Sequence, residues 1–224
     1  MPLSSSKSVK SESVKSKSVK ISESRPFDQE SRSAWNRIEA PMWQGSEADI
    51  RQGLPFNLLS PTWQMFLLGD GAPTRHLQLL TQSEISVDVV AMIPIGDDDD
   101  NAPADISAIA SPRIRRQIWL RSQQTGEIFS HATSWWSVAT MEKYLKDPSL
   151  PIWVSLNQKY TELYRDLKGI YKGACPNVAT AFGYPEIDTY WGRHYLLWHG
   201  GEPITMIYEI YSPAIGKYLG SSSL

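Results

Sequence analysis

The sequence predicts an α+β fold built on an antiparallel β-sheet. Segments with strand-like alternation recur in pairs joined by short turns, and helical segments lie mainly toward one end. The chain has 224 residues, of which 41% are hydrophobic and 11% aromatic. That length and composition can supply one substantial core, or at most two small ones. We therefore expect a folded globular protein with a single main domain.

The overall charge and the histidine and cysteine content exclude several classes of function. A net charge of −2 gives no general attraction to nucleic acid or to an anionic membrane. No apolar run approaches the roughly 20 residues that span a bilayer. A single cysteine excludes an internal disulfide, and the histidines show no metal-ligand spacing. We expect a soluble protein of a reducing compartment with no metal site; the residues concerned are Cys175, His76, His131, His194 and His199.

The chain divides by composition into three parts. Residues 1–24 repeat a Ser-Val-Lys-Ser theme with few large apolar side chains, which predicts a disordered basic tail. The alternative is an organelle transit peptide, although such peptides favour Arg and this tail has only Lys. Residues 25–58 carry aromatic residues between Pro and Gly, so we expect them to wrap the surface of the domain. The domain itself is expected over residues 59–219.

Helix and strand signals follow in order along that domain. Ser60-Pro61 has the form of an N-cap followed by proline at the first helical position. Gly200-Gly201 reads as the turn of a final hairpin. The predicted helices cover residues 60–68, 75–80 and 138–146. The predicted strands cover residues 86–94, 113–121, 127–135, 190–199 and 203–212.

The strand Arg113–Arg121 contains one anomalous charge. Ile114, Arg116, Ile118 and Leu120 share one face, and the other basic and amide side chains share the opposite face, which can be solvated. Arg116 therefore lies in a row of aliphatic residues. A guanidinium among buried apolar groups is unfavourable unless an anion meets it. We thus expect Arg113, Arg115 and Arg121 to face solvent and Arg116 to have an acidic or anionic partner.

Glu209 is a second charge inside an apolar strand, because it shares a face with Ile207 and Tyr211. From the residues alone, the simplest account is a buried salt bridge between Arg116 and Glu209. The alternative is that both charges serve a ligand. Arg193 and His194 could also hold an anion, but an exposed strand end explains them equally well.

Asp97 to Asp100 form a run of four carboxylates. They could coordinate a hard cation, but they lack the alternating spacing and the glycine of a calcium loop. We expect a solvated, mobile loop. We expect His76 and His131 to lie at the edges of helices or strands.

The region from about Leu59 to Pro213 resembles chorismate lyase, in the branch found in cyanobacteria and plastids. No single motif is diagnostic, but their order and spacing together are specific to that family. The matching motifs are Leu59-Ser-Pro61, Leu67-Leu68 and Asp70-Gly-Ala-Pro-Thr74; Arg116-Gln-Ile-Trp-Leu120 and Gly126-Glu127; Thr161-Glu-Leu163; Trp191-Gly-Arg193; and Gly201-Glu-Pro203, Tyr208-Glu209 and Pro213.

The resemblance implies a role for each matched residue. Arg116 would bind the ring carboxylate of chorismate and of the product 4-hydroxybenzoate, and Glu209 would meet the ring hydroxyl and handle a proton. Leu163 would give a backbone contact, and Pro73 and Thr74 would belong to a flap over a closed internal pocket. Pro73 stands where the family has a methionine, and Tyr164 follows Leu163 in place of a glycine.

The family resemblance implies a monomer with helices packed on one side of the sheet. The family's reaction needs neither a metal nor a redox cofactor. The partners would be chorismate and 4-hydroxybenzoate, with no nucleic acid and no stable membrane insertion. We expect a cytoplasmic enzyme, or a stromal one in an algal plastid, whose product feeds plastoquinone synthesis. The rival is a small-carboxylate sensor of the same fold, as in bacterial transcription regulators, although residues 1–58 show no helix-turn-helix pattern.

Overall fold

The computed structural model describes residues 34–54, 59–147, 150, 152, 155, 162–185 and 189–220. Residues Trp35–Leu224 form one compact unit, which begins after Ala34. The predicted basic tail, residues 1–24, lies outside the described residues. None of the described helices is long and apolar enough to cross a membrane.

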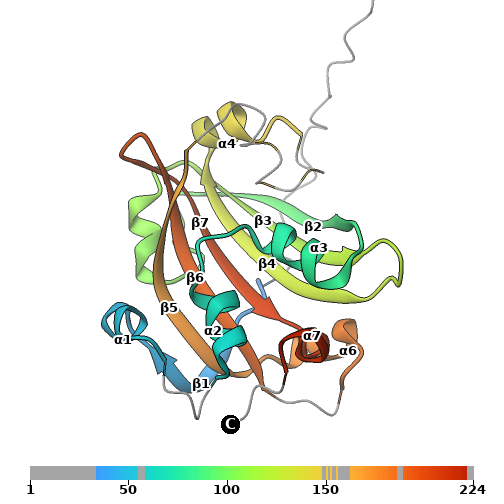
Figure 1. The fold of residues 1–224 in the computed structure, drawn as a ribbon. Helices are drawn as coiled ribbons and strands as arrows, with labels where there is room; N and C mark the ends of the chain where they lie inside the picture. Colours follow the sequence, from blue (N-terminus) through green and yellow to red (C-terminus); the bar gives the residue numbers. More distant parts are fainter. Residues whose placement is uncertain are drawn as a thin grey trace, which may run out of the picture. The chain divides into compact units, whose positions relative to one another are not determined.

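The larger unit is built on a seven-stranded sheet in which every neighbouring pair is antiparallel (Figure 1). The strand order is β1-β5-β6-β7-β4-β3-β2, so two three-stranded meanders are joined where β4 pairs with β7. The predicted α+β antiparallel fold is confirmed. The strands are β1 (Glu39–Gly45), β2 (Ile85–Gly96), β3 (Arg113–Ser122), β4 (Ile128–Ser137), β5 (Tyr164–Ala174), β6 (Tyr190–His199) and β7 (Glu202–Tyr211).

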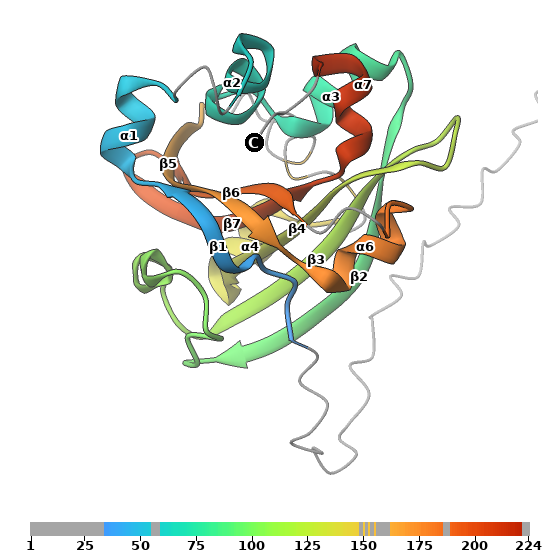
Figure 2. The same ribbon diagram turned by 90° about the horizontal axis from the view of Figure 1, so that it is seen from below.

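Helices cover both faces of this sheet. In Figure 2, α1, α2, α3 and α7 lie on one face, which we call the cavity face, and α6 lies on the other. The helices are α1 (Glu47–Gln52), α2 (Pro61–Leu68), α3 (Pro73–Thr81), α4 (Val138–Tyr144), α6 (Pro176–Phe182) and α7 (Gly216–Leu219). Two 3-10 helices, η2 (Ala104–Ala108) and η3 (Pro213–Ile215), complete the described elements.

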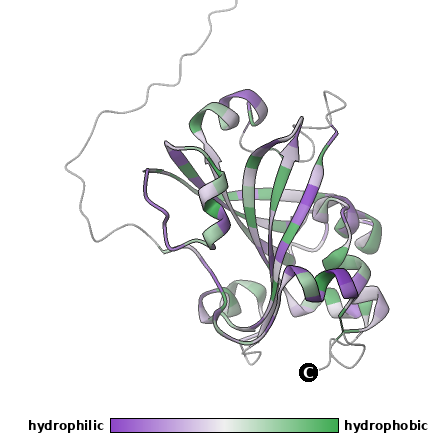
Figure 3. Cartoon of the chain, turned by 90° about the vertical axis from the view of Figure 1, so that its left-hand side faces the viewer, coloured by the Kyte–Doolittle hydropathy of each residue, from purple (hydrophilic) through white to green (hydrophobic). Residues whose placement is uncertain are grey.

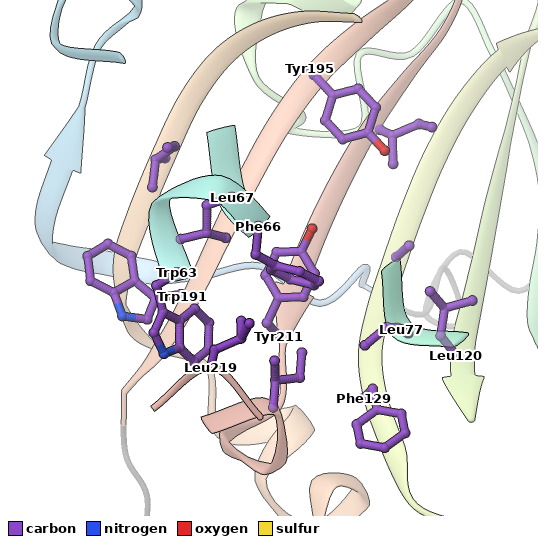
Figure 4. Packing of buried hydrophobic residues seen from close by; sticks show 14 of the residues in the cluster. Trp63, Phe66, Leu67, Leu77, Leu120, Phe129, Trp191, Tyr195, Tyr211 and Leu219 are labelled. Carbon is purple, nitrogen blue, oxygen red and sulfur yellow. The ribbon is translucent and has the colours of Figure 1, made fainter. Parts of the chain in front are cut away.

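The core on the cavity face forms where α2 packs against β6 and β7. Trp63, Phe66 and Leu67 of α2 point at Trp191 and Tyr211 of the sheet (Figure 4). The rings of Phe66 and Tyr211 meet edge to face with centroids 5.0 Å apart. Burying a large apolar side chain stabilises a fold by roughly 1.5–3 kcal/mol, so this contact is a main support of α2.

The core on the opposite face is formed by the strands, α6, η2 and the segment before β1. Trp35 and Ile38 pack there with Ile106 of η2 and with Val178 and Phe182 of α6. Apolar and polar residues alternate along the strands, as the colouring of Figure 3 shows. Both rows of each central strand are nevertheless largely buried. The sheet is therefore covered on its two faces.

Local sequence signals explain several boundaries. The Ser60 hydroxyl accepts a hydrogen bond from the Trp63 amide, so α2 begins where the N-cap pattern predicts. Gly200 and Gly201 have φ of 60° and 82°, which only glycine adopts without strain, and they form the β6–β7 turn. The predicted helices and strands are all found, with small shifts of their ends. The sequence reasoning missed β1, α1, β5, α6 and α7.

Segment 25–58 contributes more than a surface wrapping. Its residues Glu39–Gly45 form the edge strand β1 beside β5, and Ser46 caps α1 through a capping box with Asp49. Residues 25–33 and 55–58 of the predicted segment lie outside the described residues.

The prediction that Arg113 and Arg115 face solvent is wrong, because both are buried and pair with the acidic loop. Asp97, Asp98 and Asp99 of that loop are exposed as predicted, but Asp100 is not. Arg115 is 2% exposed and its Nη1 donates to Asp100 Oδ1 at 2.6 Å. Arg113 is also buried and donates to Asp99 at 3.0 Å. The Trp135 indole donates to the second Asp100 oxygen at 2.9 Å. The acidic loop is therefore held against the sheet.

Two histidines are also more buried than expected. His131 lies within β4 beside the Trp119 ring and is 1% exposed, so it is not at a strand edge. His194 is 4% exposed and lies between the Tyr171 hydroxyl, 2.8 Å from Nδ1, and Asp105, 3.0 Å from Nε2. The prediction of an exposed strand end at His194 is wrong.

Candidate functional site

A cavity of about 310 Å³ lies between the cavity face of the sheet and the segment that joins α2 to α3. The strands supply an apolar floor made of Val87, Ile118, Leu120, Ala132, Leu197 and Ile207. The α2–α3 segment supplies the cover, made of Asp70, Gly71, Ala72, Pro73 and Thr74. The remaining described lining residues are Ile152, Leu163, Arg165, Tyr195 and Glu209.

Glu209 of β7 is the buried carboxylate of this cavity. It is 3% exposed and accepts hydrogen bonds from Arg193 Nε at 2.8 Å and from the Tyr195 hydroxyl at 2.9 Å. Arg193 and the Tyr211 hydroxyl both donate to Oε2, and Tyr195 donates to Oε1. A carboxylate offers about four acceptor positions, so Oε1, which receives only Tyr195, has room for one more donor.

The charged form of Glu209 is strongly favoured. Burial alone would raise the pKa of Glu209, but the charges of Arg193 and Arg165 and the hydrogen bonds from Tyr211 and Arg193 lower it. Glu209 can therefore accept a proton or a hydrogen bond, but it carries no proton of its own to donate at neutral pH.

Arg193 of β6, not Arg116, is the salt-bridge partner of Glu209. Arg193 is fully buried, and its Nη1 also donates to the backbone carbonyl of Phe66 at 3.2 Å. The simplest account from sequence, an Arg116–Glu209 pair, is wrong. The interpretation of Arg193 as an exposed strand end is also wrong. Buried charges of opposite sign are tolerated when they pair and hydrogen-bond, and here the pair also joins α2 to the sheet.

Arg116 lies on the cavity face but is not among the described residues that line the cavity. Cross-strand pairing places it in one row with Ser134, Ile207 and Tyr195. Ile207 and Tyr195 line the cavity. The Arg116 side chain is 0% exposed, and its Nη2 donates to the Leu150 carbonyl at 3.3 Å. Burial lowers its pKa to about 10, so it stays charged at neutral pH.

The other three residues of the predicted site line the cavity directly. Pro73 and Thr74 are buried at the start of α3, and Leu163 precedes β5. Proline is favoured at the first turn of a helix, which explains how α3 begins at this point in the cover. The structure thus gathers Pro73, Thr74, Leu163 and Glu209 around one space, with Arg116 beside it.

Sequence reasoning missed two polar residues of the cavity, Arg165 and Tyr195. Arg165 is 8% exposed, and its guanidinium carbon lies 4.4 Å from the centre of the Tyr195 ring. The signal was available, because Leu163, Arg165 and Leu167 alternate like Ile114, Arg116 and Ile118. Arg193 stands in the same way between Trp191 and Tyr195. The alternation criterion that selected Arg116 would have selected all three arginines.

An apolar cavity with a few convergent charged groups defines a domain that binds a small molecule. The sequence matches the family model described as chorismate pyruvate-lyase, Rv2949c-like, over residues 67–219. The chain belongs to this Rv2949c-like chorismate pyruvate-lyase family.

Relatives and solved structures are consistent with that membership. The chain is 34% identical over 174 residues to uncharacterized protein ycf21 of Cyanophora paradoxa, covering 78% of this chain and 89% of the relative. It is 31% identical over 156 residues to ycf21 of Porphyra purpurea, covering 70% and 83%. The effector domain of PhnF from Mycobacterium smegmatis superimposes with a TM-score of 0.51 at 10% identity, covering 65% and 91%. That likeness concerns the fold alone.

Proposed function

We propose that this protein is a chorismate lyase, which converts chorismate to 4-hydroxybenzoate and pyruvate. The observation that carries the proposal is a cavity with a buried, ionised glutamate and cationic side chains beside it, in a chain of the chorismate pyruvate-lyase family. A volume of about 310 Å³ is at the small end of ligand pockets and suits a single-ring acid.

The reaction asks the protein mainly for binding and proton handling. Chorismate has a ring carboxylate, a ring hydroxyl and, on the neighbouring carbon, an enolpyruvyl ether that bears the second carboxylate. The hydrogen on the hydroxyl-bearing carbon leaves as a proton and the ether C–O bond breaks. Its electron pair goes to the enolpyruvyl oxygen, and the ring becomes aromatic. Protonation of the released enolpyruvate gives pyruvate, so 4-hydroxybenzoate and pyruvate account for every atom.

Glu209 is proposed to meet the ring hydroxyl. Its Oε1 has an acceptor position left beside Tyr195, and it faces the cavity. Since its pKa is lowered, it would hold the hydroxyl by accepting a hydrogen bond and stabilise positive charge that develops on the ring. Glu209 would therefore act as a base or orient the substrate. It would not act as an acid, because that role requires a raised pKa.

Arg116 is proposed to bind the ring carboxylate at the other end of the cavity. An arginine meets a carboxylate with a planar, two-pronged fit that lysine cannot match. Arg116 shares a cross-strand row with two residues that line the cavity. A change of its side-chain torsions that breaks the hydrogen bond to the Leu150 carbonyl would turn the guanidinium toward the ligand. Leu163 and the Pro73–Thr74 start of α3 would close over the ring.

The direct test is to mix the purified protein with chorismate and to follow pyruvate and 4-hydroxybenzoate together. We expect equal amounts of both products to appear. Arg116→Ala should abolish turnover, and Glu209→Gln should reduce it strongly. Both variants need a melting curve beside the assay, because Glu209→Gln removes the charge partner of buried Arg193. Near wild-type rates in both folded variants would refute the assignment.

A second candidate is a sensor module that binds a small carboxylate without chemistry. Two observations favour it: the fold is shared with the effector domain of PhnF, and Glu209 is held by three donors that restrict its movement. The same assay separates the candidates, since a sensor would bind chorismate or 4-hydroxybenzoate without releasing pyruvate. If lyase activity is found, the product would supply an aromatic head group for quinone synthesis.

A further inference from the structure

Arg165 is a buried cation at the cavity whose protein contacts use only part of its donor set. It enters the cavity from the start of β5 and is 8% exposed. Its Nη1 donates to the carbonyls of Gly69 at 3.0 Å and Gly71 at 2.8 Å, so both hydrogens of that nitrogen are used. These contacts and the Tyr195 ring beneath it fix the plane of the guanidinium.

The other edge of the same guanidinium is unused. Nε is buried and has no hydrogen-bond partner within the described chain, and Nη2 donates to none of the described residues. Nε and Nη2 form one planar edge, which is the geometry that receives the two oxygens of a carboxylate. A buried donor without a partner is unfavourable by about 1–3 kcal/mol, so an acceptor is expected there.

The charge balance at the cavity also calls for an anion. Arg193 and Glu209 neutralise each other, whereas Arg165 forms no salt bridge with any residue that the structure describes. Asp70 lines the cavity as well, but it is exposed and makes no such contact either. The first turn of α3, with no side-chain cap at Ala72, brings the positive end of a helix to the same cover.

We propose that Arg165 binds the carboxylate of the enolpyruvyl side chain of chorismate through its Nε and Nη2 edge. This inference rests on the proposed function and assigns the ligand's second carboxylate. Arg165 and Glu209 line the same cavity with Tyr195 in contact with both. Because the ether carbon of chorismate neighbours the hydroxyl-bearing carbon, a hydroxyl at Glu209 directs the side chain toward this region.

In this role Arg165 would act on the leaving group. When the ether C–O bond breaks, the electron pair goes to the enolpyruvyl oxygen, and the departing group carries its carboxylate charge as well. A cation fixed by two backbone carbonyls would hold this group and partly neutralise the charge without needing to reorganise. The product 4-hydroxybenzoate lacks the second carboxylate, so it should depend little on Arg165.

The test compares ligands that carry one and two carboxylates. For wild type, Arg165→Gln and the control Arg121→Gln, kcat/KM is measured for pyruvate release from chorismate. The dissociation constant of 4-hydroxybenzoate is measured for the same proteins by calorimetry. Arg121 lies outside the cavity and pairs with Asp88 at 2.6 Å, so its variant reports the general effect of losing an arginine from the sheet.

We expect Arg165→Gln to lower kcat/KM by about tenfold or more, as loss of a charge-assisted hydrogen bond implies. The dissociation constant of 4-hydroxybenzoate should change by less than about threefold in the same variant. Arg121→Gln should change neither quantity. If kcat/KM changed by less than about threefold, or if kcat/KM fell and the dissociation constant of 4-hydroxybenzoate rose by the same factor, Arg165 would be only a clamp for the Gly69–Gly71 cover.

The result can be separated from failure of the proposed function. If wild type binds chorismate but releases no pyruvate, the lyase proposal fails. The Arg165 assignment is then judged by the dissociation constants of chorismate and 4-hydroxybenzoate in the same proteins. Should Arg165→Gln not fold, Arg165→Lys keeps the charge and a donor for the carbonyls but loses the planar edge. Arg165→Lys should weaken the reaction or binding of chorismate and leave the binding of 4-hydroxybenzoate nearly unchanged. Equal losses with the two ligands would again overturn the assignment.

Discussion

At the scale of single residues, two buried arginines each pair with one particular carboxylate. Arg193 pairs with Glu209 and Arg115 with Asp100, and each pair also receives indole or phenol donors. Such pairs add little net stability over apolar residues, but losing one partner is strongly unfavourable. The acidic loop shows this directly, because Asp99 and Asp100 pair with buried arginines, whereas Asp97 is exposed.

Asp100→Asn should therefore destabilise the fold, whereas Asp97→Asn should not. Asp100 binds buried Arg115 and the Trp135 indole, and its backbone carbonyl accepts from the Trp35 indole. We expect the free energy of unfolding to fall by about 3 kcal/mol in urea titrations, near the lower end for a broken buried pair. Equal stability of the two variants would return the loop to the solvated state predicted from sequence.

His131 should make stability depend on pH. Burial lowers its pKa to about 3 from an ordinary value of 6.5. The folded protein keeps the ring neutral while the unfolded chain binds a proton below pH 6.5. This contribution is complete above 6.5 and is lost as the pH falls from 6.5 toward 3.

Replacing His131 should remove that part of the slope. In His131→Gln, the fall in unfolding free energy below pH 6.5 should be shallower than in wild type, by up to about 1.4 kcal/mol per pH unit. Urea titrations across this range measure it. Parallel profiles for wild type and His131→Gln would contradict the assignment.

At the scale of elements, Ile38 and the first residues of β1 explain two glycines of the sheet. A Cβ at Gly192 of β6 would lie 2.8 Å from the Glu209 carbonyl oxygen and 2.9 Å from Ile38 Cδ1. At Gly173 of β5, a Cβ would lie 2.8 Å from Ile38 Cγ2 and 2.9 Å from the Pro41 Cα. The sheet lacks side chains there because residues 38–41 cross close above it.

Gly192→Ala should therefore lower the melting temperature by several degrees, since Ile38 or β7 must move. Gly216→Ala is the matched control, because nothing lies within 4 Å of its Cβ and its φ is −56°. In that helical position alanine should raise stability slightly, by about 0.5 kcal/mol. Thermal unfolding followed by circular dichroism compares the two. Equal melting temperatures would mean that the crossing of residues 38–41 does not constrain β6.

At the scale of the whole molecule, two meanders joined at β4 and β7 form one curved support for the cavity. Glu209, Arg193 and Arg165 come from three successive strands, whereas Arg116 comes from the other meander. The cover comes from the α2–α3 segment that precedes them all in sequence. The described lining of the site therefore draws on β2 to β7 and on the α2–α3 segment.

Removing residues 1–24 should leave this unit intact. That stretch is basic and poor in large apolar side chains, and the compact unit begins at Trp35. The shortened chain should keep the wild-type melting temperature and the wild-type kcat/KM for chorismate. A fall of more than a few degrees would show that the tail packs on the domain, and it would contradict the predicted boundary.

The sequence by itself determined five of the seven strands, the helices α2 and α3 beside the cavity, and two of the charges that do not fit their rows. Period-two alternation, the Ser60 N-cap and the Gly200-Gly201 turn are local signals, which can be recognised without knowledge of the tertiary structure. They selected Arg116 and Glu209, and their motifs pointed to the family.

Only the tertiary structure decided which charges meet. Arg193, Arg115 and Arg116 all stand in strand rows, and no local pattern says which carboxylate each will contact. That depends on strand order, register and the path of distant segments, which bring Glu209 to Arg193 and Asp100 to Arg115. The same fold leaves the Arg165 Nε without a partner in the described chain, because the contacts of this side chain to the cover are made by Nη1 alone.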